Sequence, residues 1–396
     1  MLDITVFLNE DRLGIHALQS SNKLARFKVH EQLSRVHFLP PHYLIASSLK
    51  KPILYVWNMF QDSSVQKYVL PGMALSLATS PCGKYIAVGV DNTVKFWHLP
   101  TGQLVNTVSN HYQKVTSLVW SHDGRLVVSG GADNNVNVWE FHKIVGLESG
   151  VSPLFTLTNH SLPVSDLYCG QGGAKSRLFT SSLDNTCNVY ELSTGKLIIS
   201  LEFPAPIFKL LVDKCETYVM AVTVSTDVYK VSLMDAIDTD VSKDMKPFIR
   251  SPHKITCCCL TEEDSAVILG TTTTDFSKYC VVTGQQLPYS FKPRTPVDDV
   301  LTVTLSSYKR NDKPAPFPFP RMLQRATTGV LSECSLVLQP EPPQLDMCSD
   351  EEYLAMVREA VREEKNDAAE LRGRLGEMGA ISEELIKFAS ERILGS

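Results

Sequence analysis

One short pattern recurs along this chain of 396 residues at intervals of about forty residues. The clearest copies are VDNTVKFWHLPTGQL, ADNNVNVWEF and LDNTCNVYELSTGKL, in which an aromatic residue follows an Asp by six positions and ends an alternating apolar segment. Those aromatic residues are Trp97, Trp139 and Tyr190. In four weaker copies the same position is occupied by His16, Trp57, Val231 and Tyr279. The steps between the seven positions are 41, 40, 42, 51, 41 and 48 residues, which predicts seven copies of one folding unit.

A repeat of roughly 40 to 45 residues, with an Asp followed by an aromatic residue at the end of the third strand, is typical of WD-repeat blades. Each such blade is a four-stranded antiparallel sheet. In the best copy, HYQKVTSLVWSHDGRLVVSGGADNNVNVWEF, three alternating strands are separated by turns at HDG and ADNN. The sequence therefore predicts an all-β fold, a seven-bladed WD-repeat β-propeller.

The two ends of the repeat region predict how the ring closes. The N-terminal segment supplies ITVFLN and RLGIHAL before its outer strand NKLARFKV, so the first blade lacks an innermost strand. PVDDVLTVTL follows the seventh blade and has no blade of its own. We expect this segment to become the innermost strand of the first blade, because its pairing with ITVFLN removes two open sheet edges. The predicted propeller then covers residues 1–308.

Two repeats carry polar residues at the positions where WD repeats build a hydrogen-bonded set that joins the strands of one blade. The first set is His111, Ser129, Asp133 and Trp139. The corresponding positions in the next blade are His160, Thr180, Asp184 and Tyr190. In the preceding blade the Ser position is Ala87, so that set is incomplete. The fixed offset of His and Asp from the strand aromatic favours a structural role over an acid/base pair.

Composition and charge narrow the classes of function. Hydrophobic residues make up 43% and charged residues 20%, which predicts a folded chain, and the net charge of −5 argues against a broad basic face for nucleic acid. The start MLDITVFLNEDRLG lacks the features of a signal peptide, and no uninterrupted apolar stretch reaches about 18 residues. We expect a soluble intracellular protein with no membrane contact and no strong direct nucleic-acid binding.

No motif predicts catalysis, a cofactor or a metal. GQGGAKS differs from a phosphate-binding loop in its glycine spacing and lies between two predicted strands, and neither GxSxG nor HExxH occurs. The ten cysteines show no zinc-site spacing, and Cys257, Cys258 and Cys259 are expected to be reduced, buried strand residues. A propeller enzyme would need convergent acidic or His side chains at the central channel. We therefore predict a protein that is not an enzyme.

At HYQKV, HSLPVSDLYCGQGG, TSSLDNT and SPCGKYIAVGV the chain resembles the WD repeat-containing protein 18 family, the metazoan counterpart of the WD-repeat subunit of the yeast Rix/Ipi pre-ribosome complex. A proline-rich FPFPR segment and a C-terminal helix also match. We interpret the Leu-Pro after His160 and the Cys-Gly-x-Gly-Gly insertion as the cause of the 51-residue step. The last three blades depart from the pattern, with Val231 and Tyr279 in place of Trp.

The resemblance implies a non-catalytic scaffold in 60S subunit maturation and rRNA processing. Its implied partners are a proline-, glutamate- and leucine-rich helical-repeat scaffold, a second helical-repeat subunit, and, through the complex, pre-60S particles and the AAA ATPase midasin. The implied location is the nucleus, in nucleolus and nucleoplasm, with the cytoplasm as a further location. The alternatives are a WD-repeat adaptor of a ubiquitin ligase or chromatin complex and, less favoured, a propeller enzyme.

Two segments follow the predicted propeller. Residues 309–345 are rich in proline, which favours an extended linker or a docking segment in which Phe317 and Phe319 point to the same side. Residues 346–396 carry an apolar stripe at helical spacing, which predicts an amphipathic, coiled-coil-like helix. Its candidate homodimer contacts are Leu371, Leu375, Met378 and Leu385. The competing hypothesis is that this stripe packs back on its own propeller.

Overall fold

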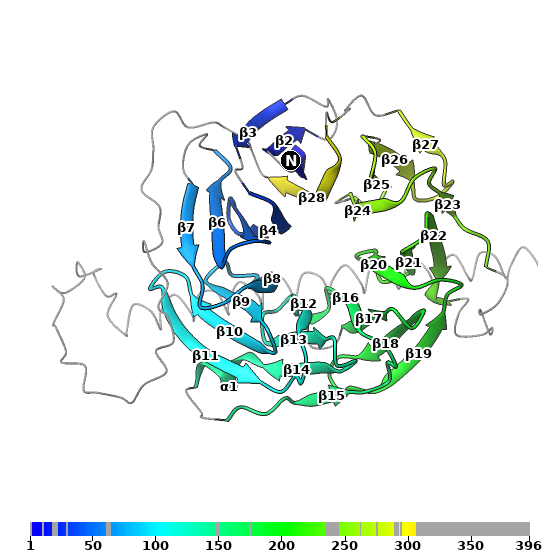
Figure 1. Ribbon diagram of the computed structural model, residues 1–396. Coiled ribbons are helices and arrows are strands. Elements are labelled where there is room, and N and C mark those ends of the chain that lie inside the picture. Colours follow the sequence, from blue (N-terminus) through cyan, green and yellow to red (C-terminus); the bar gives the residue numbers. More distant parts are fainter. Residues whose placement is uncertain are drawn as a thin grey trace, which may run out of the picture. The chain divides into compact units, whose positions relative to one another are not determined.

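The computed structural model describes residues 2–305, except for 10–11, 18–22, 29–30, 61–64, 147–149, 174–175, 235–244, 262, 275, 289–292 and 294. The predicted Pro-rich segment at 309–345 and the predicted helix at 346–396 lie outside the described residues. The described strands form seven four-stranded antiparallel sheets arranged around a central channel (Figure 1). The prediction of a seven-bladed, all-β propeller is confirmed.

The strands of each blade are given from the channel outwards. Blade 1 contains β28 (Val297–Leu305), β1 (Leu2–Asn9), β2 (Arg12–Ala17) and β3 (Lys23–Lys28). Blade 2 contains β4 (Leu33–Leu39), β5 (Tyr43–Ser48), β6 (Ile53–Asn58) and β7 (Val65–Val69). Blade 3 contains β8 (Ala74–Thr79), β9 (Tyr85–Val90), β10 (Thr93–His98) and β11 (Gln103–Ser109). Blade 4 contains β12 (Val115–Trp120), β13 (Leu126–Gly131), β14 (Val136–Glu140) and β15 (Phe155–Leu157).

The other three blades follow the same order. Blade 5 contains β16 (Val164–Cys169), β17 (Arg177–Ser182), β18 (Thr186–Glu191) and β19 (Leu197–Glu202). Blade 6 contains β20 (Ile207–Val212), β21 (Tyr218–Thr223), β22 (Asp227–Ser232) and β23 (Ile249–Arg250). Blade 7 contains β24 (Ile255–Leu260), β25 (Ala266–Thr271), β26 (Phe276–Cys280) and β27 (Gln286–Leu287). The short helix α1 (Phe141–Val145) lies between β14 and β15.

The ring closes between the two ends of the described chain. β28 pairs antiparallel with β1, with Thr302 opposite Thr5, and β1 pairs in turn with β2. The Asn9 side-chain amide also donates to the hydroxyl oxygen of Thr295 at 2.9 Å. The predicted closure is therefore confirmed, and blade 1 combines one strand from the end of the repeat region with three from its start (Figure 1).

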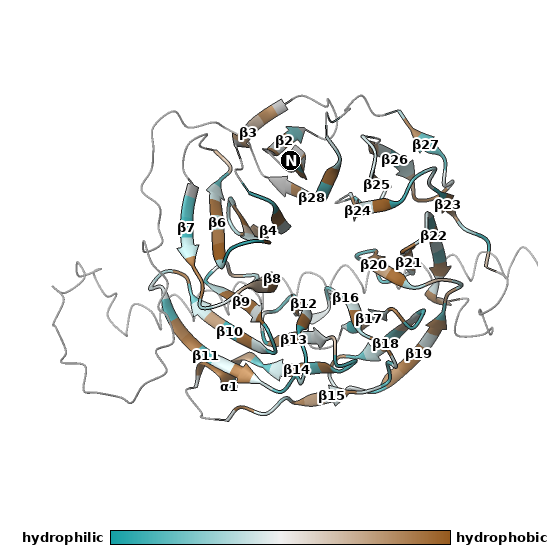
Figure 2. Ribbon diagram, in the orientation of Figure 1, coloured by the Kyte–Doolittle hydropathy of each residue, from teal (hydrophilic) through white to brown (hydrophobic). Residues whose placement is uncertain are grey.

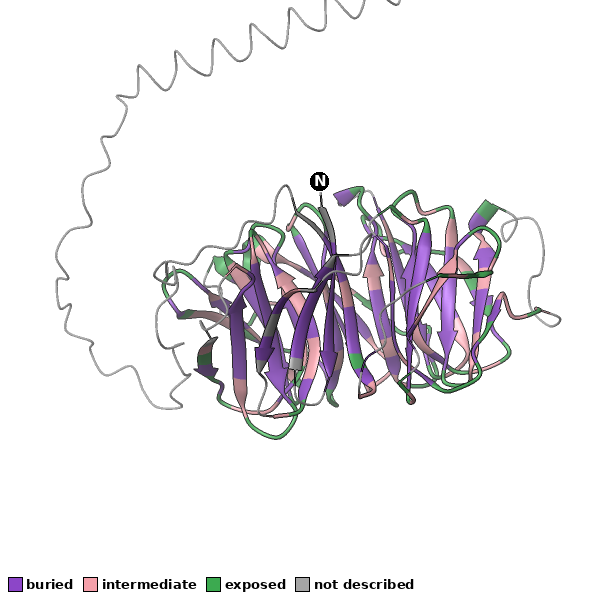
Figure 3. Cartoon of the chain, turned by 90° about the horizontal axis from the view of Figure 1, so that it is seen from above, coloured by how far each residue is buried: buried purple, intermediate pink, exposed green. Residues whose placement is uncertain are grey.

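The repeat position identified in the sequence lies in the third strand of every blade. Trp57, Trp97, Trp139 and Tyr190 are there at most 1% exposed. In blades 3 and 4 each Trp lies opposite an apolar residue of the second strand, Ile86 or Val127. Because alternate strand residues point to opposite faces, buried apolar side chains of neighbouring blades pack into shared clusters, and Trp97 and Trp139 each belong to one. Brown, hydrophobic segments recur in the strands in Figure 2, and most of the strand ribbon is coloured as buried in Figure 3.

The 51-residue step has a different cause from the one proposed on sequence grounds. Cys-Gly-x-Gly-Gly begins at the last residue of β16, and the loop that follows covers residues 170–176, only slightly more than the corresponding loop at 121–125. The connection between β14 and β15 covers residues 141–154, whereas its counterpart in blade 3 covers 99–102. The interpretation of the glycine insertion was wrong: most of the extra length is α1 and the segment after it. Ile144 of α1 is buried, and its carbonyl accepts a hydrogen bond from Asn106 at 2.9 Å.

Two other expectations concern the first strands of blades 5 and 7. The GQGGAKS segment connects β16 to β17, so its predicted strand flanks are confirmed. Cys257, Cys258 and Cys259 are buried, free thiols of β24. Burial raises the pKa of Cys258 to about 11, so its thiol is protonated at neutral pH.

Candidate functional site

Blade 4 brings the four sequence-predicted residues together in one chain of hydrogen bonds. The Trp139 indole N–H donates to Ser129 Oγ at 2.9 Å, and Ser129 Oγ lies 2.8 Å from His111 Nε2. His111 Nδ1 lies 3.0 Å from Asp133 Oδ1. With Trp139 donating to Ser129, the hydroxyl can donate to Nε2, and Nδ1 carries the proton that faces the carboxylate. The set thus joins β13, β14, the turn between them and the loop before β12.

In blade 5, three of the four corresponding residues form the same contacts. His160 Nε2 lies 2.8 Å from Thr180 Oγ1, and His160 Nδ1 lies 3.2 Å from Asp184 Oδ2. Burial lowers the pKa of His160 although Asp184 acts in the opposite direction, so the imidazole is neutral at neutral pH. The Tyr190 hydroxyl is buried and forms no hydrogen bond with the described residues that corresponds to the one from the Trp139 indole to Ser129.

An asparagine that the sequence analysis missed belongs to each set. Asn137 Nδ2 lies 3.1 Å from His111 Nε2, and its Oδ1 accepts from Thr156 at 2.9 Å, which connects the outermost strand. In blade 5 Asn188 Oδ1 accepts from Ser200 at 2.6 Å. Both asparagines follow the repeat Asp by four positions, a shared spacing that could have identified them. Blade 3 has Lys95 at that position, which agrees with its incomplete set.

These sets are closed to substrates. The His111 side chain is 1% exposed and that of Asp133 is 4% exposed, and their polar atoms already contact protein groups. A general acid or base needs a free site within hydrogen-bond reach of a substrate proton. The geometry therefore supports a stabilising function for these residues.

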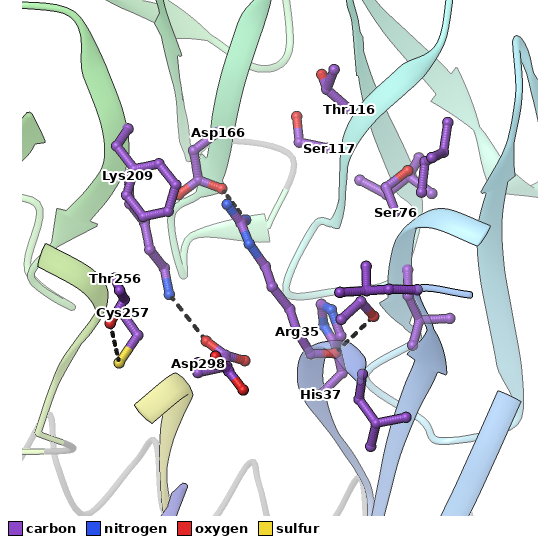
Figure 4. Close-up of a pocket in the computed structure, with 18 of the residues that line it drawn as sticks. Arg35, His37, Ser76, Thr116, Ser117, Asp166, Lys209, Thr256, Cys257 and Asp298 are labelled. Carbon is purple, nitrogen blue, oxygen red and sulfur yellow. Dashed lines mark hydrogen bonds and ion pairs between the residues drawn. The ribbon is translucent and has the colours of Figure 1, made fainter. Parts of the chain in front are cut away.

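The central channel contains a second cluster of polar side chains, which the sequence motifs did not indicate. The innermost strands line a cavity of about 560 Å³ (Figure 4). Each strand contributes one residue at an equivalent register position, at or beside a β-bulge that re-aims the side chain. We call these residues the channel ring: Asp299, Arg35, Ser76, Ser117, Asp166, Lys209 and Cys257.

Ion pairs cross the channel between blades that are not neighbours. Arg35 of blade 2 reaches Asp166 of blade 5, with Nη1 and Oδ1 3.0 Å apart (Figure 4). Lys209 of blade 6 lies 4.0 Å from Asp299 of blade 1 and donates to the Cys258 carbonyl at 2.9 Å. The channel thus gathers acidic groups, as a propeller enzyme would require, but it places a cation against each ring carboxylate.

The ring carboxylates also bind backbone of the next blade. Asp166 accepts a hydrogen bond from the Leu210 amide at 3.1 Å, and Asp299 accepts one from the Val36 amide at 2.7 Å. The Thr116 and Thr256 hydroxyls similarly donate to carbonyls of the following blade. Because these bonds run from blade to blade, the arrangement stabilises the ring and leaves neither carboxylate placed for acid/base work.

His37 lies in the channel wall beside these cations. Burial, together with Arg35 and Lys209, lowers its pKa to about 3. The unfolded chain takes up a proton near pH 6.5 and the folded chain only near pH 3, so this histidine does not affect stability above pH 6.5 and increasingly opposes folding as the pH decreases toward 3. Between pH 7.5 and 5 we expect a loss of up to about 2 kcal/mol in unfolding free energy from this group.

Urea unfolding at the two pH values tests this expectation. A His37→Asn variant should lose less stability between pH 7.5 and 5 than the unsubstituted protein. His122→Asn, at an exposed turn position, is the matched control. An equal pH dependence in the His37→Asn variant and the unsubstituted protein would contradict the assignment.

Metal and membrane sites were also sought. Within the described ranges, no cluster of three or more His, Cys, Asp or Glu side chains could hold a metal ion. No helix in the same part of the chain is both long and apolar enough to cross a membrane.

Comparison with known proteins agrees with this architecture. The family model for the WD domain, G-beta repeat, matches residues 65–98 and 102–140, which run from β7 of blade 2 through blade 3 to β14 of blade 4. WD repeat-containing protein 18 of Danio rerio is 33% identical over 205 residues, 51% of this chain and 47% of that protein. Its Homo sapiens counterpart is 33% identical over 194 residues, 48% of this chain and 45% of the relative.

A fungal relative is more distant. The pre-rRNA-processing protein crb3/ipi3 of Schizosaccharomyces pombe is 25% identical over 213 residues, 52% of this chain and 48% of that protein. The chain thus spans about half the length of the curated relatives it matches, and no enzyme family is indicated. The resemblance found in the sequence is confirmed: this chain is a seven-bladed WD-repeat β-propeller similar to WD repeat-containing protein 18.

Proposed function

We propose that this protein is a non-catalytic scaffold subunit of a nuclear pre-ribosome complex that acts in 60S subunit maturation and rRNA processing. The observation that carries the proposal is its similarity to WD repeat-containing protein 18 and to fungal proteins named for pre-rRNA processing. The geometry is compatible with a scaffold, because the conspicuous His, Asp, Arg and Lys side chains join strands or blades to one another.

The proposed partners are a proline-, glutamate- and leucine-rich helical-repeat scaffold and a second helical-repeat subunit. Through them the protein helps to recruit the AAA ATPase midasin to pre-60S particles, in the nucleolus and nucleoplasm. Phe317 and Phe319, outside the described residues, are proposed to dock on the propeller or on a partner. In this assignment the chemistry of ribosome assembly belongs to the partners.

Affinity purification from nuclear extract tests the proposal. The tagged full-length chain should recover pre-60S proteins and precursor rRNA of the large subunit, and its depletion should make that precursor accumulate. A variant with charge-reversed channel ring residues would be a poor control because it risks misfolding, so an unrelated tagged propeller serves instead. Recovery of ubiquitin-ligase or chromatin subunits without pre-ribosomal factors would favour the adaptor alternative and overturn the proposal.

We further propose that residues from about Asp350 to Ile393 form a helical homodimer. An unbroken helix of that length would extend roughly 60 Å at about 1.5 Å per residue, more than one propeller rim would easily cover. Its apolar stripe, with Leu371, Leu375, Met378 and Leu385, therefore needs a second surface.

Light scattering coupled to gel filtration checks the dimer. The full chain should have about twice the chain mass of 44.0 kDa, and a chain ending at Gln344 should be monomeric. A variant with Leu371→Asp and Leu375→Asp should also become monomeric if the stripe is the interface. A monomeric full-length protein at micromolar concentration, or a dimeric truncated one, would show that the tail is not the dimerisation element.

A further inference from the structure

The central channel contains a cavity of about 560 Å³ that is lined by residues of the innermost strands of all seven blades (Figure 4). Leu49 and Leu75 also line it and are 55% and 40% exposed, so the cavity is open to solvent. Ligand pockets of proteins typically have volumes of about 300–1,000 Å³. The cavity is therefore large enough for a small organic molecule.

The Arg35–Asp166 ion pair spans this channel from blade 2 to blade 5 (Figure 4). Blades 3 and 4 lie between those two blades. Their innermost strands, β8 and β12, contribute Leu75, Leu77 and Leu118 to the cavity wall. The wall of blades 3 and 4 thus offers apolar side chains against which the hydrocarbon part of a ligand can pack.

Arg35 has hydrogen-bond donors that the protein does not use. Its guanidinium carries five N–H groups, and within the described residues it forms one hydrogen bond, from Nη1 to Asp166 at 3.0 Å. The Arg35 side chain is 40% exposed. In the wall of blades 3 and 4, by contrast, the Ser76 and Thr116 hydroxyls already donate to backbone carbonyls. The guanidinium therefore has the largest number of free donors in this part of the cavity.

Lys209 and His37 add further donors to the cavity. The Lys209 ammonium carries three N–H groups and donates one hydrogen bond, to the Cys258 carbonyl at 2.9 Å. It lies 4.0 Å from Asp299, which is an ion-pair distance but too long for a hydrogen bond. Burial, together with the two cations, lowers the pKa of His37 to about 3. The neutral ring therefore has one N–H group, which no described residue accepts.

The carboxylates of the cavity limit the charge that a ligand can carry. Asp166 and Asp299 each accept a hydrogen bond from a backbone amide of the next blade, and Asp298 also lines the cavity and is exposed. Three carboxylates thus face two cations, which disfavours a ligand with two or more negative charges. A single planar carboxylate instead matches the N–H fork of a guanidinium group.

We propose that the channel cavity binds a small monocarboxylate with an apolar body. The carboxylate accepts hydrogen bonds from the N–H groups of Arg35 that Asp166 leaves free, and the apolar body packs against Leu77 and Leu118. Lys209 supplies a further positive charge to the same cavity. This site does not depend on the proposed scaffold function, because it uses only side chains inside the channel.

Saturation-transfer NMR on the purified full-length protein tests the site with four probes of similar size: benzoate, benzamide, phenyl phosphate and benzylammonium. They share a phenyl ring and differ in charge and in acceptor groups. Benzoate should bind with a Kd of about 1 mM or lower. Its binding should be at least about fivefold tighter than that of the other three, because it alone combines a carboxylate with a single negative charge.

Two variants and a control locate the binding in the channel. Leu75→Trp places a large ring at the open end of the cavity and should weaken benzoate binding at least about tenfold. Arg35→Gln with Asp166→Asn removes both charges of the ion pair together and should weaken it by a similar factor, about tenfold. Leu197, 37% exposed on the outermost strand of blade 5, provides the matched control Leu197→Trp, which should bind benzoate like the unsubstituted protein.

Three results would overturn the inference: a benzoate Kd above about 1 mM, equal or tighter binding of any other probe, or benzoate binding that Leu75→Trp leaves unchanged. Circular dichroism of each variant checks that the propeller is intact. If the protein with Arg35→Gln and Asp166→Asn does not fold, the comparison of Leu75→Trp with Leu197→Trp still decides. Because the probes contain no pre-ribosomal material, their failure to bind would leave the proposed function standing, and failure of the nuclear purification would leave this site standing.

Discussion

A chain without residues 1–10 is expected to lose the cooperative propeller fold and to aggregate. These residues include β1, which lies between β28 and β2 in blade 1. Ile4, Val6 and Leu8 are at most 1% exposed, and burial of one such side chain contributes about 1.5–3 kcal/mol. Their joint loss approaches the whole stability of a typical domain, about 5–15 kcal/mol, and it also opens two sheet edges.

Urea unfolding followed by tryptophan fluorescence, together with light scattering, checks this expectation. The control is a chain ending at Gln344, which keeps both β1 and β28 and should unfold in one cooperative transition. An independent variant is Val303→Asp, which places a carboxylate at a buried position of β28 and should be strongly destabilised. A soluble chain without residues 1–10 that unfolds like the full protein would show that this strand pair does not hold the ring closed.

Asp133→Ala is expected to lower the unfolding free energy by about 3 kcal/mol. Its carboxylate accepts from the Tyr112 amide at 2.9 Å and from the Asn135 amide at 3.3 Å, and it faces His111 Nδ1. Removal leaves His111 Nδ1 and the Asn135 amide without their acceptor in a partly buried region, where each unsatisfied group costs about 1–3 kcal/mol, whereas the exposed Tyr112 amide can bind water instead. The loop with Tyr112 should loosen at the same time.

Asp91→Asn is the matched control for this experiment. Asp91 has the same place in the repeat, six residues before Trp97, but it is exposed and has Ala87 where blade 4 has Ser129. Asn is chosen because Asp91 has a φ of 51°, a conformation that Asn adopts more readily than Ala. Urea unfolding should place this variant within about 0.5 kcal/mol of the unsubstituted protein. Equal losses for the two variants would argue against a special stabilising role of the His–Asp set.

The hydrogen-bonded sets of blades 4 and 5 also position loop backbone at the surface. Asp133 and Asp184 are buried members of blade 4 and blade 5, yet their acceptor atoms position Tyr112 and Ser161 at the surface.

Much of this architecture can be predicted from sequence because each blade is a local unit. The Asp, the turn and the aromatic residue lie within one short segment. The six-residue step from Asp133 to Trp139 therefore predicts where the third strand lies, where it ends, and which of its faces is buried. The closure of the ring follows from the same local logic, since a single unassigned strand at 297–305 meets a blade that lacks one. The hydrogen-bonded sets have fixed spacings for this reason.

The channel ring was decided by tertiary structure alone. Arg35 and Asp166 are 131 residues apart in the chain and belong to blades on opposite sides of the channel, so no spacing in the sequence connects them. Each ring residue is one position on an ordinary inner strand, and a β-bulge determines that its side chain turns into the channel. The length of the connection at 141–154 also could not be assigned from the sequence, because the end of β14 and the start of β15 were not known. The pattern within a blade involves residues that are close in the sequence, so the sequence predicts it. Contacts across the channel join residues that are far apart in the sequence and form only when all seven blades have closed the ring.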